Sequence, residues 1–274
     1  MSIARNMSLT PLHYQTPNLC TLLPLLGTVA TIAAPCFLIK SAIANIVGYT
    51  TIDAPEAGKF LAVALQFEDV AAADNVKVAD MITVATPKGM PGLTPAADQI
   101  WLWDTDGNDW VKYFYRSTNS AWCKQGETTE TTDTIKPGET AFFRRGGGGV
   151  ATTLTLAGGV KPFTAQPTYS NLVAGRYAFM AYPWPVGMKI SDFKNYQGAP
   201  KGMPGLTPAA DQIWLWDTAG NDWVKYFYRS TNSAWCKQGE TTETTDVIPA
   251  GEGFFFRRGG GGSTDTVTFT YSAE

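Results

Sequence analysis

Two sets of tryptophans, each with a lysine close by in the sequence, are the residues best suited to bind a ligand. Tryptophan rings stack on sugars because the C–H groups of a sugar meet the electron-rich ring face, and a polar neighbour fixes the orientation. The candidate residues are Trp101, Trp103, Trp110, Lys112, Trp214, Trp216, Trp223 and Lys225. The same side chains would serve equally well as an apolar core, and both interpretations stay open.

Residues for catalysis are scarce. The only histidine is His13, which lies in a predicted leader, so the mature chain would have no Ser–His pair, no Cys–His pair and no histidine metal ligand. We therefore predict a protein that is not an enzyme, with no catalytic residue and no cofactor. A glycosidase with paired carboxylates is the remaining alternative, and each repeat would then need its own cleft.

Two further motifs resemble binding loops. Residues 104–109, DTDGND, have the alternating carboxylates that calcium prefers, but the second copy replaces Asp106 with Ala219 and no bidentate glutamate follows. We interpret this segment as a hairpin turn and predict no metal site. Arg144 and Arg145 precede four glycines that lack the Lys-Ser/Thr of a phosphate loop, which favours a flexible turn.

Four cysteines are present, and Cys20 and Cys36 fall in the predicted leader. The other two, Cys123 and Cys236, occupy the same position in two copies of a repeat. Copies arranged as beads would hold these thiols too far apart for a disulfide within the chain. The thiols would then be buried and free, or would form cross-links to neighbouring molecules.

The elements that carry these residues occur twice. Residues 87–149 recur as residues 200–262, and only six of the 63 positions differ. The differing pairs are Asp106/Ala219, Thr134/Val247, Lys136/Pro249, Pro137/Ala250, Thr140/Gly253 and Ala141/Phe254. Residues 57–64 also align with residues 174–181. A repeat predicts one structural unit built twice, as β domain 1 over 45–159 and β domain 2 over 160–274.

The N-terminus has the pattern of a leader. Residues 19–39 are uncharged, and Lys40 and an A-x-A site at Ala42 and Ala44 follow them. This pattern predicts a signal peptide over residues 1–44, and an uncleaved membrane anchor is the alternative. The mature protein would be extracellular, on the cell surface or in the periplasm, and it would meet a membrane only through an uncleaved leader.

Each unit has the pattern of a β structure. Short runs of Phe, Trp, Tyr, Val and Thr alternate with Gly, Pro, Asn and Asp, which predicts strands. The expected strands are 46–52, 60–67, 99–104, 110–116, 120–125, 140–145 and 152–157, with copies in the second unit. Helical turns are expected only at 76–81, at its counterpart 188–193, and at 94–98. The predicted fold class is all-β, with two tandem antiparallel sandwich or barrel-like domains.

The central hairpin of each unit can be predicted in register. With Asp106-Gly107 at the tip, Trp103 pairs with Trp110, and alternation gives two apolar faces. One face holds Ile100, Leu102, Val111, Tyr113 and Tyr115, and the other holds Trp101, Trp103, Trp110, Lys112 and Phe114. The hairpin is then either buried on both sides or presents an aromatic face to a partner.

Several short motifs resemble a group of known sequences. They are Val47-Gly48-Tyr49, the Ala-Gly-Lys-Phe strand at 57–60, the Trp-x-Trp-Asp hairpin, Pro-Gly-Glu-x-x-Phe-Phe at 137–143, and a closing Thr-x-Thr strand. Together they resemble the uncharacterised secreted β-rich proteins of the planctomycete–verrucomicrobial group of bacteria. The resemblance implies an exported β protein, and it implies no activity or catalytic residue.

These patterns lead to two functional hypotheses. The net charge is −3 and charged residues make up 16% of the chain, which gives no basic surface for nucleic acid. The first hypothesis is a non-catalytic, exported structural or surface-assembly protein that associates with itself, for example as filaments, through its repeated domains. The alternative is a bivalent carbohydrate-binding module that uses exposed Trp and Tyr faces to bind glycan.

Overall fold

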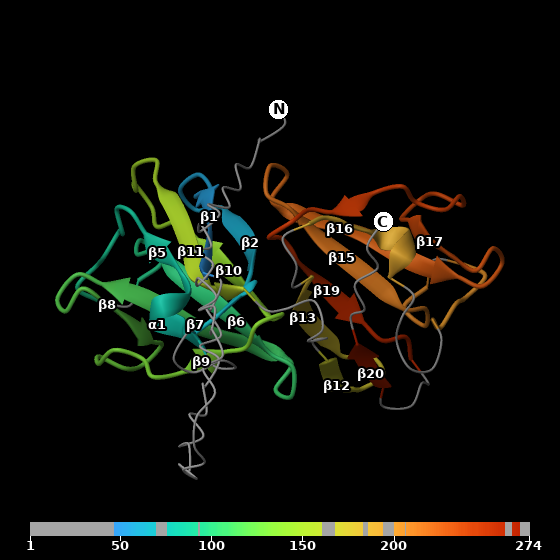
Figure 1. Ribbon diagram of the computed structural model, residues 1–274, viewed down its shortest axis with the longest axis horizontal. Coiled ribbons are helices and arrows are strands. Elements are labelled where there is room, and N and C mark those ends of the chain that lie inside the picture. The colour runs from blue at the N-terminus through green and yellow to red at the C-terminus, as the bar shows by residue number, and fades with distance from the viewer. Residues whose placement is uncertain are drawn as a thin grey trace, which may run out of the picture.

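The computed structural model describes residues 47–69, 76–92, 94–160, 168–182, 186–193, 200–205, 207–260 and 265–268. The predicted signal peptide, with His13, Cys20 and Cys36, lies outside these ranges. We refer to residues 47–160 as the first half and to residues 168–268 as the second half. Figure 1 shows them as two lobes that lie side by side.

Two sheets form the first half. The five-stranded sheet has the order β2 (Phe60–Ala64), β10 (Thr140–Arg144), β6 (Gln99–Asp104), β7 (Asp109–Arg116) and β8 (Ala121–Lys124). The second sheet joins β1 (Val47–Asp53), β11 (Thr153–Val160) and β3 (Phe67–Glu68), with β5 (Thr83–Val84) also on β11. A short pair, β4 (Val76–Lys77) and β9 (Thr134–Ile135), flanks the one-turn helix α1 (Val78–Met81).

The second half repeats this arrangement. Its five-stranded sheet has the order β13 (Tyr177–Ala181), β19 (Gly253–Arg257), β15 (Gln212–Asp217), β16 (Asp222–Arg229) and β17 (Ala234–Lys237). Two pairs accompany it: β12 (Thr168–Leu172) with β20 (Asp265–Thr268), and β14 (Met188–Lys189) with β18 (Val247–Ile248). The 3₁₀ turn η1 (Ile190–Asp192) stands where the first half has α1. The all-β fold class is thus confirmed.

The core of each half lies on one face of its five-stranded sheet. The hairpin register is the predicted one, because Trp103 pairs with Trp110 and Ile100 pairs with Tyr113. Alternation therefore points Ile100, Tyr113 and Phe143 into the first core, where they meet Leu154 and Leu156 from β11. Two sheets that share one apolar layer form a sandwich.

All three expected helical segments differ from the structure. In 188–193, Met188 and Lys189 pair with β18, and only the 3₁₀ turn η1 follows. In the segment 76–81, residues Val76 and Lys77 pair with β9, so the helix covers only Val78–Met81. Residues 94–98 form a turn, closed by a hydrogen bond from Ala97 N to the Thr94 carbonyl oxygen at 3.0 Å. The turn does not continue as a helix because Asp98 N donates to the Lys88 carbonyl oxygen at 2.8 Å instead.

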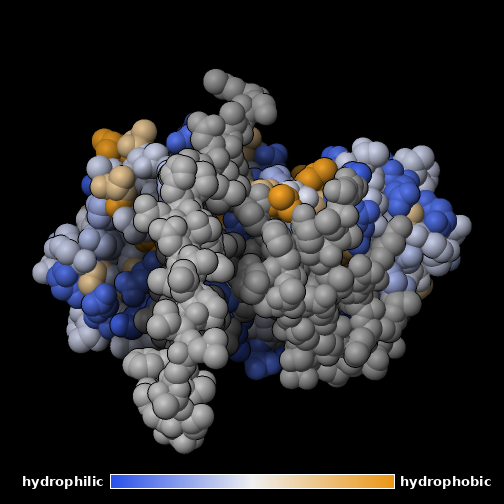
Figure 2. Space-filling model, in the orientation of Figure 1, coloured by the Kyte–Doolittle hydropathy of each residue, from blue (hydrophilic) through white to orange (hydrophobic). Residues whose placement is uncertain are grey.

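The visible surface is largely polar. In Figure 2, hydrophilic residues gather over the outer ends of the two lobes, and apolar residues form small patches. Among the residues with described burial, the large apolar side chains that are exposed are Tyr49, Val150, Val173, Val186 and Val247. Within the described ranges, no helix has the length and hydropathy needed to cross a membrane.

Candidate functional site: an aromatic cleft between the two halves

The outer faces of the two five-stranded sheets face each other. Each sheet turns one face to its own core, so the predicted Trp101, Trp103 and Trp110 face lies on the opposite side. The corresponding face of the second half packs against it. Between them lies a cleft of about 360 Å³, which we call the aromatic cleft. Its lining residues are Phe60, Trp101, Trp103, Trp110, Phe142, Tyr177, Trp214, Trp216, Trp223 and Phe255.

The structure brings all six predicted tryptophans into this one cleft. Each is half-buried. The two faces are therefore not separate, freely exposed platforms, and the bivalent arrangement expected from the sequence does not match this geometry. The sequence cannot show this because alternation assigns residues to a face without revealing what covers that face.

Ring contacts run across the boundary between the halves. Trp103 lies 5.1 Å from Phe255, and Trp216 lies 5.1 Å from Phe142, both edge to face. The ring centroid of Phe179 in the second half lies 5.0 Å from that of Phe142 in the first half. Edge-to-face and offset arrangements are the favourable geometries for aromatic pairs, so these contacts stabilise the packing of the two sheets.

Hydrogen bonds between the halves occur in matched pairs. The indole N–H of Trp103 donates to the Tyr177 carbonyl oxygen at 2.7 Å, and Trp216 donates to the Phe60 carbonyl oxygen at 2.9 Å. Trp216 is the repeat of Trp103, and Tyr177 corresponds to Phe60. Interchanging the two halves therefore turns one hydrogen bond into the other. The halves are thus related by an approximate twofold axis.

Backbone hydrogen bonds between the halves also occur as equivalent pairs. Ala181 N donates to the Gly138 carbonyl oxygen at 2.6 Å, and Ala64 N donates to the Gly251 carbonyl oxygen at 3.1 Å. At the periphery, Arg176 donates to the Asp106 carbonyl oxygen, and the corresponding Lys59 donates to the Ala219 carbonyl oxygen. Backbone contacts of this kind fix the relative position of the two sheets independently of the rings.

The two predicted lysines cap the cleft tryptophans. Lys112 Nζ lies 4.3 Å above the Trp101 ring, and Lys225 Nζ lies 4.3 Å above the Trp214 ring. Each is a cation–π contact between directly paired strand residues. The ten lining residues include no carboxylate, and burial raises the pKa of the Tyr177 hydroxyl. The cleft therefore suits an apolar or aromatic-stacking partner and holds no acid–base pair.

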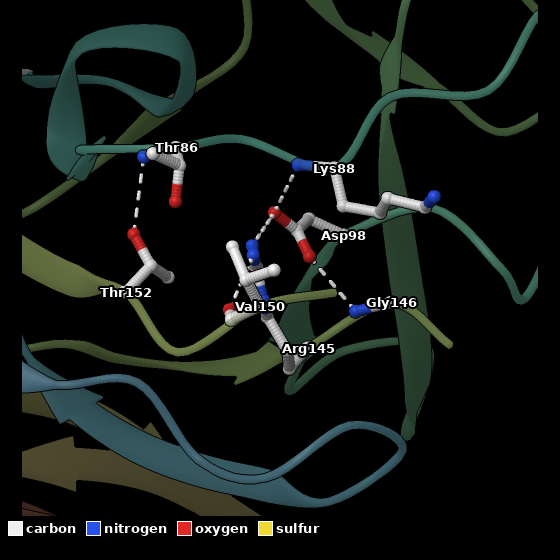
Figure 3. Close-up of polar contacts among 7 residues, drawn as sticks. All are labelled: Thr86, Lys88, Asp98, Arg145, Gly146, Val150 and Thr152. Atoms are coloured by element: carbon white, nitrogen blue, oxygen red, sulfur yellow. Dashed lines mark hydrogen bonds and ion pairs between the residues drawn. The ribbon is translucent and has the colours of Figure 1, made fainter. Parts of the chain in front are cut away.

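Each half contains a buried ion pair at the end of its five-stranded sheet. Asp98 accepts hydrogen bonds from Arg145 at 2.6 Å, Lys88 N at 2.7 Å and Gly146 N at 2.8 Å (Figure 3). Arg145 is 2% exposed and also donates to the Val150 carbonyl oxygen at 2.8 Å. Burial raises the pKa of Asp98, and the hydrogen bonds and the guanidinium oppose that shift. Asp211 and Arg258 form the same pair in the second half.

This pair corrects the interpretation of the glycine run. The run is not a free turn, because it folds tightly over Arg145. A side chain at Gly146 would meet the Ala96 backbone at under 3.0 Å, and one at Gly149 would meet the Arg145 guanidinium. Close packing therefore favours glycine at positions 146 and 149, and Gly148 takes a positive φ of 69°. Arg144 donates to the Pro95 carbonyl oxygen at 2.6 Å.

The acidic hairpin has the geometry of a turn. Asp104 Oδ1 accepts from Asp106 N at 3.0 Å, and Asp109 Oδ1 accepts from Trp110 N at 2.7 Å. Asn108 takes the positive φ of 53° that the turn needs. Across the described residues, no three His, Cys, Asp or Glu side chains gather as they would around a metal ion.

The cysteines are buried. Cys123 and Cys236 are free thiols with 0% exposure, and each lies within its own half. Asn119 donates to Cys123 Sγ at 3.6 Å, and Asn232 donates to Cys236 Sγ at 3.6 Å. This placement agrees with the buried alternative and leaves neither thiol at the surface to form the predicted cross-link.

Comparison of the chain with family models, with curated proteins and with solved structures found no match. The resemblance to secreted planctomycete–verrucomicrobial proteins and the domain boundary between residues 159 and 160 therefore stay predictions. Function must be argued from the geometry of the chain itself.

Proposed function

We propose that the chain is a non-catalytic, exported structural component of a cell surface or extracellular assembly. The observation that carries this proposal is the pairing of the two repeat copies through their aromatic faces. Each half uses an outward aromatic surface, which includes Trp103 in the first half and Trp216 in the second, to hold the other half. In the coloured part of Figure 2 the outer ends of the two lobes are mainly hydrophilic, which suits a building unit.

Self-association has a ready route in this design. The contact that joins a first half to a second half within one chain can form equally between two chains that exchange halves. Such an exchange needs no new contact surface, because the same two halves pair in either case. The second half of one chain would pair with the first half of the next chain, and so on along a series. Such a series closes into a ring or extends as a filament.

Electron microscopy and light scattering of the purified full chain test this proposal. We expect ordered oligomers or filaments that increase with concentration. Reductant should not dissolve them, because both Cys123 and Cys236 are buried. A chain that stays monomeric at every concentration, with and without reductant, would contradict a structural role.

A second candidate is a single ligand site in the aromatic cleft, favoured by its volume of about 360 Å³ and its tryptophan lining. This volume falls within the range of small-molecule sites. A glycan array probed with the wild type and with the Trp101→Ala and Trp214→Ala variants tests this candidate. Binding that both variants weaken supports a single composite site, and no binding to any glycan removes the candidate.

A further inference from the structure

We infer that the residue pair Thr140 and Gly253 makes the aromatic face selective, so that a first half pairs with a second half and not with another first half. The inference rests on the proposed structural role and deepens it, because it names the partner of the pairing surface. The partner is the opposite half, from the same chain or from another copy.

The two residues touch across the boundary. Thr140 begins β10, and its repeat position Gly253 begins β19. A side chain added at Gly253 would meet the Thr140 hydroxyl, methyl and Cβ atoms at under 3.0 Å. Thr140 is 2% exposed, so neighbouring atoms enclose it on nearly all sides. One threonine therefore fits at this contact, and two do not.

The threonine is also bonded. Its hydroxyl donates to the Met180 carbonyl oxygen at 2.6 Å in the other half. Because Gly253 has no hydroxyl, the exchanged bond to Val63, which corresponds to Met180, cannot form. This is a point where the approximate twofold symmetry of the contacts is broken.

Like pairs fail for opposite reasons. Two first halves would bring one Thr140 against another, and overpacking at a buried contact forces a shift of the backbone. Two second halves would place glycine opposite glycine and lose the hydroxyl bond to the facing carbonyl. Only the unlike pair has both the space and the hydrogen bond.

Other differences between the copies lie at the same boundary. Asp106 and Ala219 accept the bonds from Arg176 and Lys59. The turns at 136–139 and 249–252, which hold two further differing pairs, supply the carbonyl groups of Gly138 and Gly251 to the opposite half. Four of the six differing pairs thus lie where the copies meet, whereas Ala141 and Phe254 lie in the cores of their own halves, and Thr134 and Val247 lie on strand pairs inside each half.

The test is a double-mutant cycle in the full chain. Gly253→Thr makes the copies alike, Thr140→Gly removes the hydroxyl, and the double variant exchanges the two residues. We expect Gly253→Thr to lower Tm on the order of 5 °C and to increase acrylamide quenching of the tryptophans. The double variant should recover most of both changes, because the hydroxyl introduced at position 253 can donate to the Val63 carbonyl oxygen and so replace the lost bond.

Val247→Thr is the matched control. It also makes the copies alike at a differing position, but Val247 is 44% exposed and pairs with Lys189 inside its own half. This variant should keep the wild-type Tm and quenching. A Gly253→Thr variant with wild-type Tm and quenching would overturn the inference, as would a double variant no better than Gly253→Thr. If Gly253→Thr fails to fold, a folded double variant supports the inference and an unfolded one overturns it.

A failure of this inference can be told apart from a failure of the proposed function. A wild-type chain that never oligomerises would remove the structural role, yet recovery in the double variant would still establish the pairing rule within one chain. Conversely, filaments in the wild type with no recovery in the double variant would retain the role and remove the rule.

Discussion

The indole nitrogen of Trp103 lies 2.7 Å from the carbonyl oxygen of Tyr177, 74 residues away in the other half. The equivalent bond runs from Trp216 to Phe60 at 2.9 Å. These two bonds join the two halves, one from each sheet. They also show that the Trp-x-Trp motif assigns different tasks to its two tryptophans, because Trp101 donates to Gln99 within its own sheet at 2.7 Å.

Trp103→Phe should therefore weaken the contact between the halves. The change removes the donor and leaves a smaller ring, and we expect the free energy of unfolding to fall by about 1–3 kcal/mol. Quencher access to the remaining cleft tryptophans should rise. Trp101→Phe is the control, because its lost bond lies within one half and its quenching should stay unchanged. Equal quenching in the two variants would contradict the assignment.

Asp98→Asn should be severely destabilising. The change leaves the Arg145 guanidinium buried without its counter-charge, which costs about 3–5 kcal/mol. Glu56→Gln is the control, since Glu56 forms an exposed pair with Lys59 at 3.3 Å and such pairs contribute up to about 1 kcal/mol. Urea unfolding of both variants measures the difference. An Asp98→Asn variant as stable as Glu56→Gln would show that the buried pair is not needed.

The stability of the fold should fall in acid as Asp133 and its repeat counterpart Asp246 become protonated. The Lys124 ammonium and the Tyr113 hydroxyl lower the pKa of Asp133 below its ordinary value of 3.8, and the Tyr226 hydroxyl and Lys237 do the same for the pKa of Asp246. A lowered folded pKa gives stability that is complete above the unfolded pKa and is lost as the pH falls through the folded one. Asp133→Asn with Asp246→Asn should flatten the pH dependence of Tm below about pH 4. If the double variant showed the same dependence of Tm on pH as the wild type, Asp133 and Asp246 would not be the source of the loss of stability in acid.

The buried thiols should be inert in the folded chain. Cys123 and Cys236 have 0% exposure, so a thiol reagent should label neither until denaturant is added. Labelling in denaturant is the control and should reach both. Rapid labelling of Cys123 or Cys236 in the native chain, located by peptide mapping, would return cross-linking to consideration.

The sequence predicted local structure well and predicted contacts between units poorly. The Asp106-Gly107 turn and the alternation of Trp101 to Trp110 gave the hairpin register correctly, because both signals are local. The burial of Arg145 against Asp98 was missed, since 47 residues separate the two and adjacent arginines on a strand show only that they point apart. The four glycines after Arg145 were the available signal, because a run of glycines also indicates close backbone approach.

The position of the cleft was missed for a related reason. Both faces of the hairpin are apolar, and the sequence leaves a core and an exposed platform open, with the core as the commoner outcome for aromatic residues in such a pattern. The available clue was the placement of the six differences in the repeat, and Thr140 against Gly253 in particular. A difference of that kind has meaning only once the two residues are known to touch.

Small-angle X-ray scattering of the purified chain tests the central claim most directly, because the claim is that the two aromatic faces pack against each other. We predict the scattering of one compact two-lobed particle, with a single main peak in its distance distribution. Measurement at low concentration separates this from oligomers. Two well-separated lobes joined as beads would contradict the account, since Trp103 and Trp216 would then be free and the bivalent module would become the better explanation.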